Sequence, residues 1–265
     1  MILDEIVLAT RMRVVAEIER IPLKDYERQV ELILQSETSV GIAPFEEALR
    51  EPLISLICEV KKASPSKGVI VNEFDYKRIA LDYEEAGASA ISVLTEPKFF
   101  QGSVQYLKEI YETVQIPLLR KDFILSPYQI YQAKANGASC VLLICAILSP
   151  KKLEEYIKLC ESLHLSALVE IHDEEEAKIA LAAGARIVGV NNRNLKDFTV
   201  DIQNSLRLRQ RIPKEILFVA ESGIKTPTDI RRLSEADVNA VLIGETMMRC
   251  EDKKKEIAYL LSELQ

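Results

Sequence analysis

The sequence predicts a single α/β domain, a (β/α)8 TIM barrel, with an N-terminal helical extension of about 45 residues. The first observation is a repeat: amphipathic helical stretches end at Gly87, Gly137, Gly184 and Asp237, and a β-rich run follows each. The second is spacing: successive points lie about 50 residues apart, and each interval between them contains one more strand. The third is that the strands are continuous apolar runs, typical of a parallel sheet covered on both faces.

Eight βα units account for the chain after its first 50 residues. The strands are predicted near residues 54–60, 89–94, 117–122, 139–145, 166–171, 186–191, 216–221 and 240–244. A doubly wound open sheet is the alternative. It is less favoured because the even units show no reversal point and no GxGxxG follows the first strand. We therefore expect one domain over residues 1–265.

Residues 1–50 do not fit the repeat and form the extension. The stretch before Pro22 has helical apolar spacing, and "LKDYERQVELILQ" predicts a second helix. Two interpretations stay open from the residues alone. The extension could plug the bottom of the barrel, or it could form a lid at the top.

Composition limits the classes of function. The net charge of −7 argues against binding to nucleic acid or to an anionic membrane, but allows a local cationic pocket. No apolar run has the ~18 residues of a membrane span, and the start lacks the features of a signal peptide. The five cysteines form no CxxC pair and the two histidines cannot make a histidine-rich site, so we expect a cytoplasmic protein with no metal and no cofactor.

Polar side chains recur where the predicted strands end, and catalytic groups of TIM barrels come from that end. In chain order they are Glu59, Lys61, Lys121, Glu170, Asn191, Arg193, Glu221, Ser222, Gly223 and Gly244. Any one of them could be a solvated or capping group. Isolated buried charges cost several kcal/mol each, however, so a convergent ring of them indicates a site. Arg120 has the opposite parity, and we expect it to snorkel between sheet and helices.

Two segments are suited to phosphate, Ser222-Gly223 and Gly244, because backbone N–H groups after the seventh and eighth strands bind it in such barrels. Ser64 and Lys61 could contribute from the first strand. Ordinary turns are the alternative. Two lysines, three glutamates and an asparagine beside a phosphate site suit acid–base chemistry on an anionic sugar phosphate.

The chain closely resembles the indole-3-glycerol phosphate synthase family of tryptophan biosynthesis along nearly its whole length. The matching segments are "ILDEIVLATR", "LICEVKKASPSKGVI", "ISVLTEPKFFQGS", "LLRKDFIL", "ALVEIHDEEE", "VGVNNRNL", "VAESGI" and "VLIGETMM". The resemblance implies a carboxy-lyase that converts 1-(2-carboxyphenylamino)-1-deoxyribulose 5-phosphate to indole-3-glycerol phosphate, CO₂ and water. It also implies that the extension caps the active site.

The resemblance also implies roles. Lys121 would be the general acid in ring closure, Glu170 the base in dehydration, and Lys61 the group that binds the anthranilate carboxylate. Glu59 and Asn191 would hold the sugar hydroxyls and the lysines. Substrate-binding positions would be Ser64, Phe100, Phe123, Leu142, Ile144, Arg193, Glu221, Ser222, Gly223, Gly244 and Glu245. How acid and base duties divide among Lys121, Lys61, Glu59 and Glu170 stays open.

One departure concerns Glu245, where some members carry serine, so an anion stands beside the expected phosphate. Its side chain would have to turn away. Rivals are a phosphosugar isomerase, a Schiff-base aldolase using Lys121, and a non-catalytic barrel that binds a phosphorylated ligand. We expect a monomer with a small-molecule substrate that associates transiently with other enzymes of the pathway.

Overall fold

The computed structural model of the chain describes residues 2–37, 43–51, 53–194 and 198–264, and eight parallel strands in this part close into a barrel. Around the barrel the order is β1, β10, β9, β8, β7, β6, β5, β4 and back to β1. The strands are β1 (Ser55–Val60), β4 (Ala90–Leu94), β5 (Leu118–Lys121), β6 (Cys140–Ile144), β7 (Ser166–Ile171), β8 (Ile187–Asn191), β9 (Leu217–Glu221) and β10 (Ala240–Ile243). Each lies within one or two residues of its prediction, so the closed barrel is confirmed and the open sheet is excluded.

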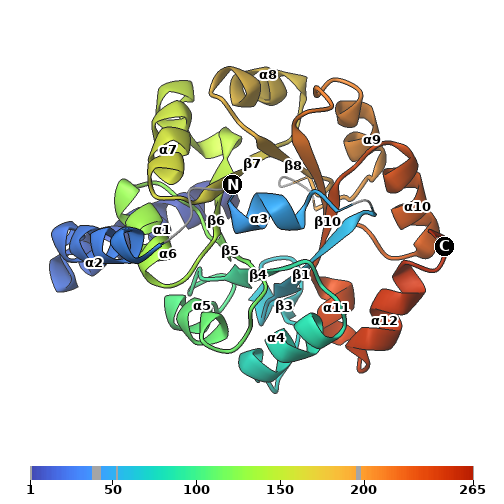
Figure 1. Cartoon of the computed structure of the whole chain (residues 1–265), viewed down its shortest axis with the longest axis horizontal. Helices are drawn as coiled ribbons and strands as arrows, with labels where there is room; N and C mark the ends of the chain where they lie inside the picture. Colours follow the sequence, from blue (N-terminus) through green and yellow to red (C-terminus); the bar gives the residue numbers. More distant parts are fainter. Residues whose placement is uncertain (1, 38–42, 52, 195–197, 265) are drawn as a thin grey trace.

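Helices form the outer ring of the barrel (Figure 1). They are α4 (Tyr76–Glu85), α5 (Val104–Tyr111), α6 (Pro127–Ala135), η1 (Cys145–Ile147), α7 (Pro150–Ser162), α8 (Glu174–Ala182), α9 (Gln203–Arg209), α10 (Pro227–Glu235), α11 (Glu245–Arg249) and α12 (Lys253–Leu260). The residues predicted to end four of them, Gly87, Gly137, Gly184 and Asp237, all have positive φ, between 60° and 92°. That left-handed conformation lets the chain leave the helix and enter the next strand. No helix of the described residues is long and apolar enough to cross a membrane.

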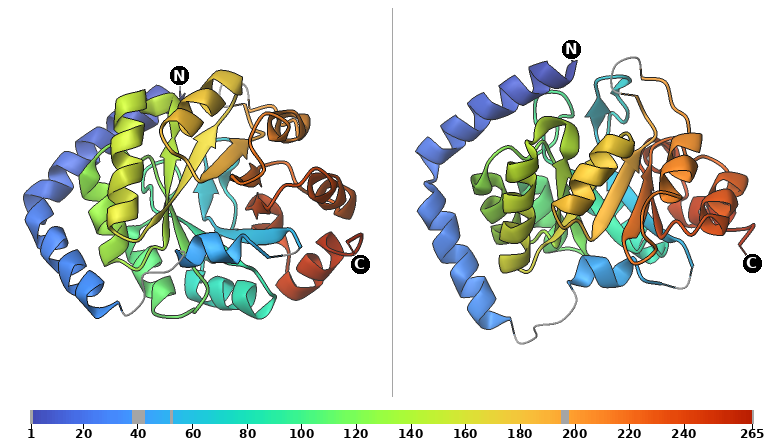
Figure 2. Two further views of the ribbon diagram at one scale, coloured as in Figure 1. Left: turned by 45° about the horizontal axis from the view of Figure 1, so that its top comes forward. Right: turned by 90° about the horizontal axis from the view of Figure 1, so that it is seen from above.

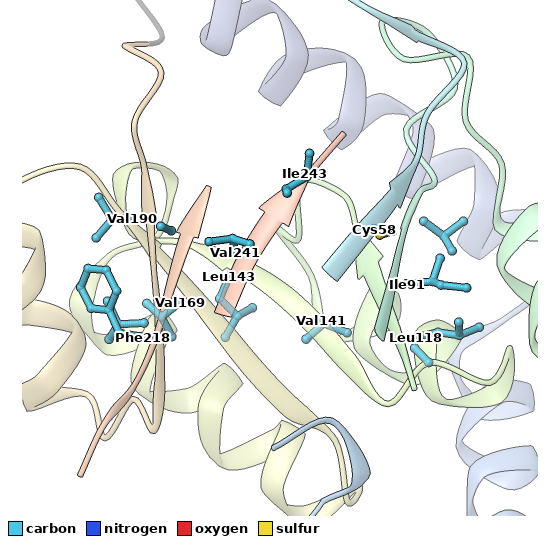
Figure 3. Packing of buried hydrophobic residues seen from close by; sticks show 14 of the residues in the cluster. Cys58, Ile91, Leu118, Val141, Leu143, Val169, Val190, Phe218, Val241 and Ile243 are labelled. Carbon is cyan, nitrogen blue, oxygen red and sulfur yellow. The ribbon is translucent and has the colours of Figure 1, made fainter. Parts of the chain in front are cut away.

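Strand alternation divides the core into two layers. Outward-facing residues such as Ile91, Val141, Val169 and Phe218 pack beneath the helices (Figure 3). Inward-facing residues fill the barrel interior as a second cluster, which includes Ile57, Leu119, Leu168 and Val219. The polar residues Glu59, Lys121, Glu170, Asn191 and Glu221 lie at alternate positions that continue this inward face at the carboxyl ends of the strands.

The extension contains three helices, one more than predicted: α1 (Ile2–Arg20), α2 (Leu23–Ser36) and α3 (Pro44–Ala48). The short α3 lies across one end of the barrel (Figure 1), and Phe45 and Leu49 are fully buried in the interior cluster. Burying such side chains stabilises a fold by roughly 1.5–3 kcal/mol each. The plug at the barrel bottom is thus α3, while α1 begins at the opposite end, beside the hairpin of β2 (Ala63–Ser64) and β3 (Gly68–Val69) (Figure 2).

One buried ion-pair network joins α1 to the barrel. The Arg13 Nη2 atom lies 2.8 Å from Asp122 Oδ1, directly after β5, and Arg120 Nη2 lies 3.1 Å from Asp122 Oδ2. Arg120 is fully buried, and it also donates to Thr95 Oγ1 and to the Gln129 carbonyl. Arg120 thus lies between the sheet and α6, as its parity predicted, and a carboxylate and two neutral oxygens satisfy its guanidinium inside the protein.

Candidate active site

A cavity of about 720 Å³ opens at the carboxyl ends of the barrel strands. Of the predicted site residues, all but Glu221 line it: Glu59, Lys61, Ser64, Phe100, Lys121, Phe123, Leu142, Ile144, Glu170, Asn191, Arg193, Ser222, Gly223, Gly244 and Glu245. They come from all eight strands or the segments that follow them. The residues at the ends of successive strands in the sequence therefore form one ring around the cavity in the structure.

The first charged pair joins Glu59 to Lys61, whose Nζ donates to Glu59 Oε1. The two residues lie two apart on β1 and just after it, so both point the same way. Gly244 follows β10, the neighbour of β1, and a Cβ at this position would overlap Glu59 Oε1. Gly244 was predicted as a phosphate-site or turn glycine. The geometry gives it a further reason, since it leaves room for the Glu59–Lys61 pair.

The second charged pair spans the barrel. Lys121 Nζ on β5 donates to Glu221 Oε2 on β9, which is the strand opposite β5 in the ring of eight. Glu221 is only 1% exposed and sits below the cavity wall, which explains its absence from the lining. A Cβ on Gly189 of β8 would overlap Glu221 Oε1, so the glycine provides the space in which this carboxylate lies.

A third group is held by hydrogen bonds. Asn191 Nδ2 lies 3.4 Å from Glu170 Oε2, and Ser222 Oγ donates to Asn191 Oδ1 at 3.0 Å. The Arg193 backbone N–H donates to the same Asn191 oxygen at 3.0 Å. Asn191 thus positions Glu170. The described hydrogen bonds give Asn191 no contact with either lysine.

Burial and close charges set the protonation of the site. Burial alone would lower the pKa of Lys121, but Glu221, Glu170 and Glu59 outweigh it and raise that pKa above its usual value. Burial also raises the pKa of Glu221 to about 7, with Glu170 and Glu59 adding to the shift and Lys121 opposing it. For Glu59 burial is outweighed by Lys61 and Lys121, which hold the pKa of its carboxyl below the usual value. Lys121 is therefore a cation at neutral pH, surrounded by carboxylates.

An apolar wall faces these charges. Phe100 and Phe123 lie with ring centroids 6.2 Å apart, and Leu142 and Ile144 of β6 line the same cavity. Residues Ile2, Leu3 and Ile6 at the start of α1 also line it. The cavity can therefore hold a ligand with one aromatic, apolar part and several anionic or hydroxyl groups.

The opposite side is cationic, and part of it was missed from the sequence. Lys67, Lys225 and Arg249 line the cavity together with the predicted Lys61, Lys121 and Arg193. Against these six cations stand four lining carboxylates, Glu59, Asp122, Glu170 and Glu245, so the described wall is cationic in a protein of net charge −7. Loop lysines and an arginine inside a helix carry no signal in strand periodicity, which is why they were missed.

Glu245 is turned toward cations. Its Oε1 lies 3.2 Å from Arg249 Nε and 3.9 Å from Lys67 Nζ. Ser222 and Gly223, which precede α10, have positive φ of 68° and 85°. Together with Ser64 of the hairpin, these residues border the side of the cavity at β1, β9 and β10.

Comparison with known proteins decides the family. The profile described as indole-3-glycerol phosphate synthase matches residues 3–260. The chain belongs to the indole-3-glycerol phosphate synthase family. The family and the enzyme class that goes with it, a decarboxylating lyase of tryptophan biosynthesis, are thus confirmed as the sequence predicted.

Individual relatives of the family agree. The indole-3-glycerol phosphate synthase of Ruminiclostridium cellulolyticum is 54% identical over 265 residues, which cover 98% of each chain. That of Lactiplantibacillus plantarum is 50% identical over 260 residues, again 98% of each chain. Among solved structures, KGPDC from Streptococcus mutans aligns with a TM-score of 0.63 over 80% of this chain and 97% of its own, at 11% identity. At that identity the likeness shows the barrel fold alone.

Proposed function

We propose that the cavity converts 1-(2-carboxyphenylamino)-1-deoxyribulose 5-phosphate to indole-3-glycerol phosphate, CO₂ and water. The observation that carries this is the single cavity in which the Lys121 ammonium and the Glu170 carboxylate face an aromatic, apolar wall. Such a wall suits the anthranilate ring, and the cationic side suits the phosphate and the carboxylate. The chemistry needs no cofactor, since loss of CO₂ restores the aromaticity of the ring.

In ring closure, the ring carbon that bears the carboxylate attacks the ribulose ketone, and the ketone oxygen becomes negatively charged. Lys121 donates a proton to this oxygen and stabilises the charge as it develops. Because Lys121 is protonated at neutral pH and paired with Glu221, the acid is in place before substrate binds. The carbon–carboxylate bond then breaks, and its electron pair restores the aromatic ring.

In dehydration, Glu170 removes a proton from the carbon adjacent to the one that bears the new hydroxyl. The hydroxyl then leaves as water with a proton from a lysine. Asn191 holds the carboxylate of Glu170 from one side. Lys61 binds the anthranilate carboxylate and serves as the second acid. Both ends of one molecule must be held close, so orientation supplies much of the acceleration.

The remaining groups bind the substrate. Ser64, Ser222, Gly223, Gly244 and the backbone of Glu245 line the phosphate side, and Phe100, Phe123, Leu142 and Ile144 flank the aromatic ring. The start of α1 supplies Ile2, Leu3 and Ile6 to the cavity wall, which supports the extension as a cap over the site. The protein works as a monomer in the cytoplasm, with transient contacts to enzymes of the same pathway. The five free cysteines fit a reducing compartment.

The proposal is tested by incubating the purified protein with the ribulose phosphate and following indole fluorescence. We expect product to accumulate in wild type. Turnover of phosphoribosyl anthranilate instead would support an isomerase, and covalent trapping by borohydride would support an aldolase. Tight binding of the substrate without any turnover would indicate that the protein is a non-catalytic binding protein.

A further inference from the structure

His172 is a partly exposed titratable group next to the site that the proposed mechanism does not use. It follows β7, two residues after Glu170. Its Nε2 lies 3.7 Å from Glu170 Oε1, and its Nδ1 lies 3.2 Å from Glu176 Oε2 on α8. The imidazole therefore stands between two carboxylates, one of them the proposed base.

The position of the ring is fixed by three elements. The backbone N–H of His172 donates to Glu176 Oε2 at 2.7 Å, and its carbonyl accepts from Asn204 Nδ2 of α9 at 3.1 Å. Asp173 caps the start of α8 by accepting from the backbone N–H groups of Glu175 and Glu176. The segment that carries the imidazole is thus tied to both neighbouring helices.

The geometry selects the charged form of the ring. A carboxylate only accepts hydrogen bonds, so each imidazole nitrogen that faces one must carry a proton. Both nitrogens of His172 face carboxylates. Nδ1 lies within hydrogen-bond distance of Glu176, and the buried Nε2 lies in ion-pair range of Glu170 with no hydrogen-bond partner among the described residues. Burial alone would lower the pKa of His172, but the hydrogen bond to Glu176 and the charges of Glu170, Glu176 and Glu221 raise it to about 9.

We propose that His172 is a positively charged positioning residue that attracts the Glu170 carboxylate and fixes its orientation. This deepens the proposed function, on which it rests, because Glu170 is the base there. Asn191 Nδ2 lies near one oxygen of Glu170 and His172 Nε2 faces the other. A hydrogen bond at one oxygen and an ion pair at 3.7 Å at the other oppose rotation of the carboxylate.

The charges around the imidazole come from every element packed against it. Glu176 lies on α8, Glu170 on β7 and Glu221 on β9, and Asn204 on α9 is neutral. Removing the imidazolium takes away the positive charge that faces Glu170 Oε1. The carboxylate should then leave its productive orientation more often, and the rate should fall.

The first experiment measures kcat and KM of His172→Gln across pH, with His164→Asn as the matched control. His164 is the chain's other histidine, half-exposed, and it pairs with Glu37 on the outer face. We expect kcat of His172→Gln to fall about tenfold at neutral pH because the base is oriented less well, with KM within threefold. Wild type should lose kcat as pH rises through about 9, where His172 gives up its proton, and His172→Gln should lack this limb, whereas His164→Asn should keep the wild-type profile.

The second variant, Glu176→Gln, keeps an oxygen that accepts the His172 backbone N–H but removes the negative charge. It should lower the pKa of His172, which the imidazole signal of the His164→Asn background reports in an NMR titration. We expect Glu176→Gln to match wild type below the new pKa and His172→Gln above it.

Unchanged kcat and an unchanged alkaline limb in His172→Gln, with turnover lost in Glu170→Gln, would overturn this inference alone. Equal losses in kcat and thermal stability with the alkaline limb retained would also overturn it, because they indicate a purely structural residue. If wild type makes no indole product at all, the proposed function fails first and this inference fails with it.

Discussion

At the residue scale, two glycines determine where the charged groups lie, because neighbouring side chains occupy the space of the missing Cβ atoms. Gly244 leaves room for the Glu59–Lys61 pair, and Gly189 leaves room for Glu221. Both glycines face the interior at the carboxyl end of the barrel, where a side chain of any size would enter the site. The absence of side chains at these two glycines therefore shapes the site as much as the ring of charged residues does.

Gly189→Ala should displace Glu221 and with it Lys121. A misplacement of ~1 Å can cost about 10² in rate, so we expect kcat to fall by about 10–10² with a lower thermal midpoint. A double-mutant cycle with Glu221→Ala tests whether the overlap with Glu221 causes the loss. In a Glu221→Ala background the overlap with Glu221 is gone and only the tight contact with Leu168 Cδ1, at 3.1 Å, remains, so adding Gly189→Ala should cost much less free energy of unfolding. A full additional loss in that background would contradict the steric account.

Glu170→Gln tests the base. The amide is nearly isosteric but cannot take a proton, so we expect turnover to drop by about 10²–10⁴ with substrate affinity retained. Glu175→Gln on α8 is the matched control, since that carboxylate is exposed and pairs only with Lys178 among the described ion pairs. A kcat within a few-fold of wild type for Glu170→Gln would assign the base to another residue.

At the element scale, α1 is held to the barrel by Arg13, which binds Asp122 next to Lys121. Burial alone would raise the pKa of Asp122, but Arg13 and Arg120 outweigh it and hold that pKa below the usual value. A depressed carboxyl pKa contributes stability that is present above its unfolded value, ~3.8, and is lost as pH falls through the folded value.

Arg13→Met should therefore lower stability and raise KM, because a helix that lines the cavity loses its anchor. The difference in unfolding free energy between wild type and variant should shrink as pH falls below about 4. Arg11→Met on the exposed face of the same helix is the control and should change neither quantity. An Arg13→Met variant with wild-type KM would show that α1 needs no anchor at Asp122.

Sequence reasoning identified the strands and nearly all of the site because both follow from local pattern. Apolar runs give the strands, and inward polar residues at the ends of five of them stand out against these runs. It missed α3, the cations Lys67, Lys225 and Arg249, and the role of His172, because each depends on which segments meet in space. The same limit applies to the partners of Arg120, since Asp122, Thr95 and Gln129 meet only after the barrel closes.

At the whole-molecule scale, the extension serves both ends of the barrel. Residues of α1 line the cavity at one end, while Phe45 and Leu49 seal the other (Figure 2). Deleting the first 45 residues, the length predicted for the extension, would remove Phe45 and thus part of the seal. The structure therefore distinguishes a truncation that removes only α1 and α2 from one that also removes α3, and the sequence alone could not make this distinction.

Deletion of residues 1–37 should leave a folded barrel that binds substrate poorly. Deletion through residue 50 should also lose Phe45 and Leu49, and a core Phe or Leu costs ~2–5 kcal/mol, so we expect unfolding or aggregation. Circular dichroism and kcat/KM on both proteins make the comparison. An undiminished kcat/KM in the shorter truncation would show that the extension does not cap the site.

In the proposed function, the barrel places the general acid of ring closure and the phosphate-binding residues in different sectors. Lys121 extends from β5, whereas the proposed phosphate residues come from the segments after β1, β9 and β10. Lys121→Ala leaves Glu221 unpaired, but the pKa of Glu221 is already raised to about 7 and should rise further, so the carboxyl can take up a proton and stay in place. Removal of the Lys121 side chain should therefore leave the proposed phosphate-binding side of the cavity intact.

The most direct test measures both kcat and the Kd for product in Lys121→Ala and Lys61→Ala. For Lys121→Ala we expect Kd within about tenfold, ~1.4 kcal/mol, and turnover lower by at least about 10²–10⁴. Lys61→Ala should weaken binding as well, because Lys61 lies near the substrate anions. If Lys121→Ala instead loses affinity and keeps near-normal kcat, the roles of the two lysines are reversed and the proposed ring closure at Lys121 is wrong.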